Sequence, residues 1–317
     1  MTSLAEAYVR WADIETRGSS PSYEEWARAI AGDDHVLTLI EALPARKRQP
    51  NLVFAAARTA GAPLDVYQRF RPWLLQHWCE VVEIVLARST QTNEAARCAV
   101  LLPELARLEG PLALVEVGAS AGLCLYPDRY SYRYRTLDGS VTLDPVTGPS
   151  PVVIECTVDD ESAAPTRLPD VVWRAGIDLN PLDVRDPEDV AWLRALVWPE
   201  HHDRRERLEA ACALVATDPP HLVRGDLLDD LDALLGSAPP DAHLVVFHSS
   251  VLTYVEPAPR QRFVERMRGL DGTWISNEGS LVLESSAGLA HDGRTVLTVD
   301  DVPVARADPH GRSLVRL

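Results

Sequence analysis

A run of small residues, Gly118-Ala119-Ser120-Ala121-Gly122, is the part of the chain best suited to chemistry. It follows the apolar run 112–117 and precedes another apolar segment, which predicts a tight turn after a buried strand. Glycines let the backbone turn sharply and approach a ligand closely, and exposed N–H groups attract negative groups, more so if a helix follows. The run therefore predicts a nucleotide-binding turn, although many βα turns contain glycine for structural reasons alone.

The same residues also fit G-x-S-x-G, the nucleophile elbow of α/β-hydrolases, with Ser120 as the nucleophile. Such an elbow follows several earlier strands, whereas only helices are expected before residue 111. A hydrolase also needs an acid and then a histidine; His248, His291 and His310 are available, but none has a compelling context. A position on the first strand favours the nucleotide-binding turn, and the hydrolase stays as the alternative.

Two later strands are expected to end in an aspartate. Asp178 ends the apolar run 171–179 and can accept both ribose hydroxyls of a nucleoside, or it simply caps the turn. This carboxylate usually follows the glycine turn by about 20 residues, and an insertion at 124–170 would explain the longer separation here. Asp226 ends the run 221–226 and can accept a hydrogen bond from an adenine amino group, with Leu227 against the base; the alternative is a helix N-cap.

Candidates for the reacting and substrate-binding groups end the next two strands. His248 follows LVVF, where it would face the pocket as a general base, with Tyr254 shortly after it; the alternative is a buried, hydrogen-bonded histidine. Asn277 and Glu278 end the strand 273–279 and are expected either to bind polar substrate groups or to form an ordinary turn.

Other substrate-binding candidates lie outside these strands. Tyr130, in the insertion, is expected to grip a small molecule or to lie in an edge strand. No metal is expected at His201-His202-Asp203, because neighbouring helical side chains diverge and no third ligand follows at a suitable spacing. A polar segment between two apolar helices is expected to cap either the pocket or a helix; its candidates are Gln91, Asn93, Glu94 and Arg97.

These residues require a sheet to position them. Residues 1–110 predict helix after helix, among them one amphipathic helix over 68–88. From residue 111, strands alternate with helices, which is typical of an α/β fold with a mostly parallel, Rossmann-like sheet. The last runs, 296–301 and 312–317, predict an antiparallel hairpin at an edge. We expect an all-helical cap domain over 1–110 and a sheet domain over 111–317, with an inserted hairpin or lid at 124–170.

Composition narrows the function classes. The formal net charge of −16 disfavours nucleic acid and anionic membranes as partners. Five cysteines without a CxxC pair favour a reducing compartment. The first residues contain no apolar signal core, and no stretch reaches the roughly 18 apolar residues of a membrane span. We therefore expect a cytoplasmic protein that acts on a small molecule.

Four strings, VEVGASAGL, GIDLNPLDV, LVRGDLLDDL and LVVFHSSVLTYV, resemble the motif series of class I S-adenosylmethionine-dependent methyltransferases. Nearly the whole chain, including RQPNLVFAA and WPEHHDRRERL, resembles the uncharacterised bacterial family catalogued as domain of unknown function 2332. Ser120 stands where many methyltransferases have a second glycine, and the long insertion after the turn is atypical. The resemblance implies a methionine-side loop with Glu116, Gly118, Ser120 and Gly122, a ribose site at Asp178 and Leu179, and an adenine site at Asp226 and Leu227.

The sequence thus predicts methyl transfer from S-adenosylmethionine to a small-molecule acceptor bound between the helical cap and the strand ends, with His248 and Tyr254 nearest the reaction. Two alternatives stay open. One is a hydrolase that uses Ser120. The other is a methyltransferase-like protein without catalysis that binds a nucleoside or a partner protein. The sequence indicates neither the acceptor nor the oligomeric state.

Overall fold

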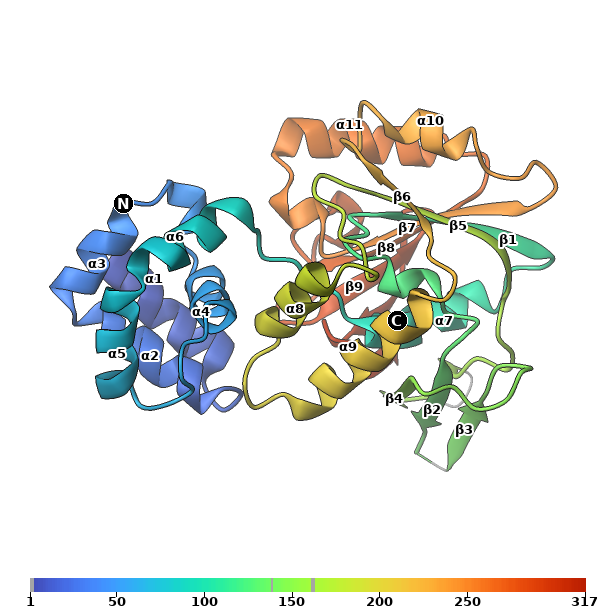
Figure 1. Ribbon diagram of the computed structural model, residues 1–317. Helices are drawn as coiled ribbons and strands as arrows, with labels where there is room; N and C mark the ends of the chain where they lie inside the picture. The colour runs from blue at the N-terminus through green and yellow to red at the C-terminus, as the bar shows by residue number, and fades with distance from the viewer. Residues whose placement is uncertain (1–2, 138, 161–162) are drawn as a thin grey trace. The chain divides into compact units, whose positions relative to one another are not determined.

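The computed structural model describes residues 3–137, 139–160 and 163–317. Its contacts divide the chain into two compact units, each assembled from two segments. The helical unit comprises Met1–Thr92 and Asp186–Glu209, and the sheet unit comprises Asn93–Arg185 and Ala210–Leu317 (Figure 1). This division differs from the single boundary expected at residue 110. Among the described residues, no helix combines the length and the apolar character that crossing a bilayer requires.

The helical unit is held together by an aromatic cluster. Trp26 stacks on Phe70 with ring centroids 3.8 Å apart, and both rings meet Phe54 edge-on. The helix expected over 68–88 is two helices, because α5 ends at Gln76 and α6 begins at Trp78, with His77 as the cap residue between them. The elements are α1 (Leu4–Trp11), the π-helix η1 (Ala12–Thr16), α2 (Pro21–Ala31), α3 (Asp34–Glu41), η2 (Ala45–Lys47), α4 (Pro50–Thr59), α5 (Tyr67–Gln76), α6 (Trp78–Ala87), α8 (Pro187–Leu196) and the first part of α9 (His202–Val215).

Helix α8 belongs to the helical unit although it follows α4 by more than a hundred residues. The guanidinium group of Arg58, on α4, donates to the carbonyl oxygens of Ala195 and Val197 at 3.0 and 2.7 Å. It thereby supplies donors that carbonyl groups at the end of a helix lack within the helix itself. The indole of Trp192, on α8, donates to the carbonyl oxygen of Ser89 at 3.1 Å. These long-range bonds explain why 186–209 groups with the helical unit.

The sheet unit contains one mixed sheet of eleven strands among the described residues, in the order β3-β2-β4-β11-β10-β9-β8-β7-β1-β5-β6. Six of the neighbouring pairs are parallel and four are antiparallel. The strands are β1 (Pro111–Val117), β2 (Ser131–Arg135), β3 (Ser140–Leu143), β4 (Val153–Val158), β5 (Asp170–Asp178), β6 (His221–Arg224), β7 (His243–Ser249), β8 (Thr273–Gly279), β9 (Thr295–Val299), β10 (Val302–Ala307) and β11 (Ser313–Arg316).

Strands β6-β5-β1-β7-β8 form a continuous parallel block. The chain runs outward from β1 through β5 to β6 and then returns to the other side of β1 to form β7 and β8. The strand order therefore reverses between β1 and β7. Helices α10 (Leu231–Leu235) and α11 (Pro257–Arg268) cover one face of this block, where Val115, Val246 and Phe263 share a buried core, and α7 (Cys98–Leu105) lies on the other side (Figure 1).

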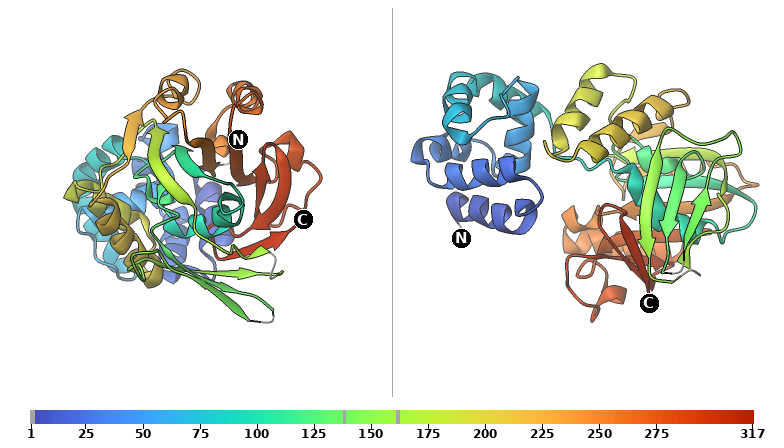
Figure 2. Two further views of the ribbon diagram at one scale, coloured as in Figure 1. Left: turned by 90° about the vertical axis from the view of Figure 1, so that its right-hand side faces the viewer. Right: turned by 90° about the horizontal axis from the view of Figure 1, so that it is seen from below.

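The strands outside the parallel block differ in part from the sequence expectation. Within the described residues 296–317, the antiparallel hairpin expected from 296–301 and 312–317 is not present. β10 lies between these two runs and pairs antiparallel with both, so β9 and β11 run in the same direction. β11 also pairs with β4 and is therefore not an edge strand. Within the insertion, β2 and β3 form an antiparallel hairpin, and the segment extends the sheet instead of covering it (Figure 2). The sheet edges are β3 and β6.

Candidate functional site

Three strand ends meet at the carboxyl edge of the parallel block. The N–H groups of Gly118 and Ala119, directly after β1, donate to the carbonyl oxygen of Ile177 in β5 at 2.8 and 3.2 Å. The N–H of Gly225, directly after β6, donates to the carbonyl oxygen of Asp178 at 3.0 Å. The glycine turn 118–122, Asp178 and the start of the loop that carries Asp226 therefore lie side by side.

The carboxylate of Asp178 holds the glycine turn. Its Oδ2 accepts the N–H of Ser120 at 2.9 Å, and its Oδ1 accepts the N–H of Asn180 at 2.7 Å. Ser120 has a φ of 50°, in the left-handed region that side chains other than glycine seldom adopt. A carboxylate offers about four lone-pair positions, so each oxygen of Asp178 keeps acceptor capacity beyond its bond to the backbone.

Position 118 requires glycine for two reasons, its backbone conformation and the lack of space for a Cβ atom. Its φ is +72°, and a Cβ atom built on it would lie 2.4 Å from Cγ2 of Val251, in the loop after β7. The turn and this loop, which flank the point where the strand order reverses, therefore pack directly on each other. The turn leads directly into the three-residue 3-10 helix η4 (Leu123–Leu125) and not into a long helix.

Asn93 clamps the other side of the turn. Its Nδ2 donates to Oγ of Ser120, and its Oδ1 accepts the N–H of Ala121 at 3.0 Å. Asn93 thus supports the turn, whereas the sequence suggested that it caps either the substrate pocket or a helix. Gln91, predicted alongside it, lies in the helical unit after α6.

Glu94 and Arg97, also predicted to bind substrate, have structural partners. Glu94 caps the 3-10 helix η3 (Ala95–Arg97), where its Oε1 accepts the N–H of Ala96 at 3.2 Å. Arg97 is buried and donates to the carbonyl oxygens of Ser249 and Pro309, both at 3.0 Å. Arg97 thereby ties the segment before α7 to the carboxyl end of β7.

Two buried polar side chains, Glu116 and Asn277, lie on the sheet face opposite the core that includes Val115. Burial raises the pKa of the Glu116 carboxyl well above its usual range, and nearby Cys124 adds to the effect. Oε2 of Glu116 and Oδ1 of Asn277 have no hydrogen-bond partner among the described residues, while Nδ2 of Asn277 donates to Oγ of Ser249 at 2.8 Å. Because buried polar atoms are seldom left without a partner, Oδ1 of Asn277 suits an N–H or O–H group of a ligand or an ordered water. The raised pKa favours the neutral carboxyl of Glu116, which can donate as well as accept a hydrogen bond.

His248 lies in a buried hydrogen-bonded chain. Its side chain is fully buried, and its Nε2 accepts the indole N–H of Trp274 at 3.1 Å. An indole nitrogen can only donate, so the ring proton of the neutral histidine lies on Nδ1 and is directed at Oε1 of Glu278, 2.8 Å away. Both ring nitrogens are therefore engaged, which favours the interpretation of a structural histidine over that of a general base.

Glu278 connects the hydrogen bonds of Trp274 and His248 to the loop after β7. Its Oε1 also accepts the N–H groups of Val251 and Leu252 at 2.8 and 3.0 Å, at the start of the 3-10 helix η6 (Leu252–Tyr254). The sequence indicated neither Val251 nor Trp274. The signal available for Trp274 was a tryptophan on a buried strand, which commonly brings its N–H to a partner.

Large apolar side chains are exposed after three of these strands. Leu179 is 70% exposed, Tyr254 84% and Leu281 74%; they follow β5, β7 and β8. Leu227 is only partly buried beside the core. Small-molecule sites are lined mainly by apolar side chains with a few polar groups, and these residues can supply the apolar part.

Asp226 and Tyr130 have local partners. Oδ1 of Asp226 accepts the N–H of Leu228 at 2.7 Å, so this carboxylate closes its own turn. It is not the helix N-cap that the sequence offered as the alternative, because the N-cap of α10 is Asp230. Tyr130 is fully buried, and its hydroxyl donates to the carbonyl oxygen of Leu123 at 2.7 Å. Tyr130 therefore supports the segment after the glycine turn from within the protein.

The contacts of Ser120 do not favour the hydrolase alternative. Its Oγ pairs with Asn93, and within 3–137, 139–160 and 163–317 no histidine hydrogen-bonds to it. A serine nucleophile needs such a base. The same part of the chain contains no group of three or more His, Cys, Asp or Glu side chains able to hold a metal ion.

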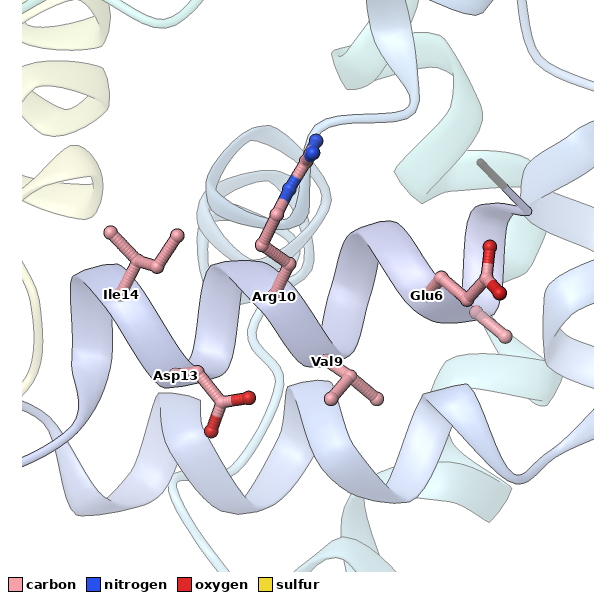
Figure 3. A pocket seen from close by; sticks show the side chains of 6 residues that line it. Glu6, Val9, Arg10, Asp13 and Ile14 are labelled. Atoms are coloured by element: carbon pink, nitrogen blue, oxygen red, sulfur yellow. The ribbon is translucent and has the colours of Figure 1, made fainter. Parts of the chain in front are cut away.

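A shallow hollow also lies along α1 and η1, far in sequence from these residues. Glu6 there belongs to the capping box of α1 with Ser3, and Asp13 pairs with Arg17 and Arg28. The side chains are spread along the helix and do not converge on one point (Figure 3). Its charged carboxylates are thus occupied by structural contacts, and we assign no chemistry to it. The lining residues are Ala5, Glu6, Val9, Arg10, Asp13 and Ile14.

Fold and site together define an α/β protein in which polar strand ends gather where the strand order of the parallel block reverses. The chain belongs to the bacterial family described as "Uncharacterized protein conserved in bacteria (DUF2332)", which matches residues 5–316. No curated protein matches the chain. No solved structure matches it either.

Proposed function

We propose that the protein binds S-adenosylmethionine at the carboxyl edge of the parallel block and methylates a small molecule there. The order β6-β5-β1-β7-β8 supports a Rossmann-like class I methyltransferase arrangement. In open α/β sheets, ligands bind outside the carboxyl ends of strands at the point where the strand order reverses. In this sheet that point lies between the glycine turn and the loop that holds Val251.

The position of Asp178 is the observation that carries the proposal. Its carboxylate is fixed by backbone N–H groups on both sides, yet each oxygen keeps acceptor capacity. A ribose diol presents two hydroxyl donors to such a carboxylate. Exposed Leu179 and partly buried Leu227 offer apolar surface for an adenine beside it.

The residues of the chain act mainly by positioning. S-adenosylmethionine, when bound, supplies an electrophilic methyl group, and the protein holds the acceptor in line with it. Tyr254 is exposed at the same edge, and the unpaired atoms Oε2 of Glu116 and Oδ1 of Asn277 can form hydrogen bonds with polar groups of a ligand. His248 supports this edge through Glu278.

Binding of S-adenosylhomocysteine, the demethylated product, tests the proposal by thermal shift and calorimetry. A ligand at 100 times its dissociation constant should stabilise the protein by about 2.7 kcal/mol. We expect Asp178→Ala to weaken binding at least about tenfold, because hydrogen bonds to a charged group contribute about 1.5–3 kcal/mol each. Asp170→Ala is the matched control, since Asp170 begins the same strand and is exposed.

Two outcomes would count against the proposal: no stabilisation by S-adenosylmethionine or its product, or equal losses in Asp178→Ala and Asp170→Ala. Ser120→Ala distinguishes the hydrolase, which would lose esterase activity, from the methyltransferase, which would keep its affinity for S-adenosylhomocysteine. A protein that binds this ligand but methylates no acceptor would fit the non-catalytic alternative.

A further inference from the structure

We infer that Glu278 is a positioning residue that fixes the loop 250–254 against the glycine turn, and that His248 and Trp274 act on the site only through it. The effect of Glu278 on ligand affinity rests on the proposed function, whereas its effect on the loop does not. The inference stands on hydrogen-bond geometry among buried groups.

The loop leaves β7 in a conformation that needs support. Ser250 has a φ of 57°, in the left-handed region, and its N–H donates to the carbonyl oxygen of Asn277 at 3.0 Å. Strained residues of this kind persist only where surrounding contacts over-determine them. The next two N–H groups, of Val251 and Leu252, both donate to Oε1 of Glu278. One carboxylate oxygen thus holds the start of the loop.

The side chain of Glu278 is itself held from the interior. Trp274 donates to His248, which directs its Nδ1 proton at the oxygen that binds the loop. Trp274, His248 and Glu278 are each at most 1% exposed. Among the described residues, His248 makes no hydrogen bond to the loop, and the two are connected through Oε1 of Glu278.

The position of the loop determines two features of the proposed site. Val251 occupies the space above Gly118 that any Cβ would need, so a shift of Val251 alters the wall of the glycine turn. Tyr254 ends η6 and is 84% exposed, so the same shift moves the exposed aromatic side chain at the edge. Glu278 therefore links the interior to both sides of the proposed ligand site.

The chain offers a matched control at the other end of the same two strands. His243 begins β7, and its Nε2 lies 2.8 Å from Oγ1 of Thr273 at the start of β8. His248 joins β7 to β8 near their carboxyl ends in the same way, through Glu278. His243→Gln and His248→Gln thus each remove a histidine that joins β7 to β8, at opposite ends of these strands. His243 is exposed and His248 is fully buried.

Amide hydrogen exchange measured residue by residue tests the inference in the full-length protein. We expect Glu278→Ala to speed exchange in 250–254 at least about tenfold and to raise it in 118–121 through Val251. His248→Gln should cause a smaller increase in the exchange rate of both segments, and His243→Gln should leave both rates unchanged. Glu278→Gln keeps an acceptor oxygen and should stay within about threefold of wild type, which provides a second variant if Glu278→Ala fails to fold.

The affinity for S-adenosylhomocysteine provides the functional readout. Glu278→Ala and His248→Gln should weaken binding at least about fivefold, while Glu278→Gln and His243→Gln should retain it. The inference would be overturned if residues 250–254 of Glu278→Ala exchanged at the wild-type rate. It would also be overturned if His243→Gln raised exchange in this loop as much as His248→Gln does. If the wild-type protein does not bind S-adenosylhomocysteine, only the proposed function is refuted, because the exchange measurement still tests the role of Glu278.

Discussion

Replacing Gly118 by alanine probes the contact between the glycine turn and the loop after β7. The φ of Gly118 is +72°, and alanine in the left-handed region costs about 1–2 kcal/mol. The new Cβ would lie 2.4 Å from Cγ2 of Val251, well inside the usual carbon–carbon separation of about 3.5–4.0 Å. Relieving such overpacking costs a further 1–3 kcal/mol or so, which gives a total of about 2–5 kcal/mol.

Gly110→Ala separates the two contributions. Gly110 has a φ of +77° and no atom within 4 Å of the position its Cβ would take, so this variant should lose only the conformational part. Urea denaturation followed by circular dichroism measures both variants, and the difference between them reports the Val251 contact. The double variant Gly118→Ala/Val251→Ala should lose less stability than the sum of the single changes. Equal destabilisation by Gly118→Ala and Gly110→Ala would refute the close packing described for this turn.

Three further substitutions test the pKa shifts of two carboxyl groups and the bonds that tie α8 to the helical unit. Burial raises the pKa of the Glu116 carboxyl in the folded protein. The free energy of unfolding of the wild type should therefore fall as the pH rises above the pKa that Glu116 has in the unfolded chain, by up to about 1.4 kcal/mol per pH unit. Glu116→Gln should remove this contribution to the pH dependence of melting curves between pH 5 and 8. The hydrogen bond from Arg71 lowers the pKa of Asp33 to about 2, so the stabilisation is present above the unfolded-state pKa and is lost as the pH falls toward 2. Asp33→Asn, which keeps a good N-cap, should therefore cost about 1–2 kcal/mol at pH 7 and little at pH 2; a constant difference would contradict the assignment. Arg58→Met should destabilise the helical unit by about 2–3 kcal/mol in urea, because two carbonyl groups at the end of α8 lose their donor, whereas Arg10→Met at an exposed position should change little.

The parallel block could be predicted because its strands carry local signals. Buried parallel strands are short apolar runs bounded by turn residues, and the runs at 111–117, 171–179 and 243–252 have that form. The structure places β1, β5 and β7 there within a few residues. Pairings between distant segments carry no such signal, so the insertion of β10 and the pairing of β11 with β4 were missed. The contacts that assign α8 to the helical unit were missed for the same reason.

The sequence indicated which polar residues end the strands but not which groups they form hydrogen bonds with. Strand alternation places Glu116 and His248 on opposite faces of the sheet, and nothing local reveals that Trp274 and Glu278 occupy both nitrogens of His248. Asn93 shows the same limit, since its type and position suited a ligand contact and its side chain instead clamps Ser120 and Ala121. The roles of Asp178 and Leu179 toward a nucleoside stay predictions that ligand binding will test.

The pairing of β11 with β4 has a consequence for biosynthesis. The ribbon formed by β2, β3 and β4 joins the rest of the sheet through β11, where Ser313 and Leu314 pair with Thr157 and Val158. While the ribosome has yet to deliver residues 313–316, β4 exposes an open strand edge, which is a template for pairing with other chains. A nascent chain stalled between β4 and β11 should therefore depend on chaperones far more than the completed protein does.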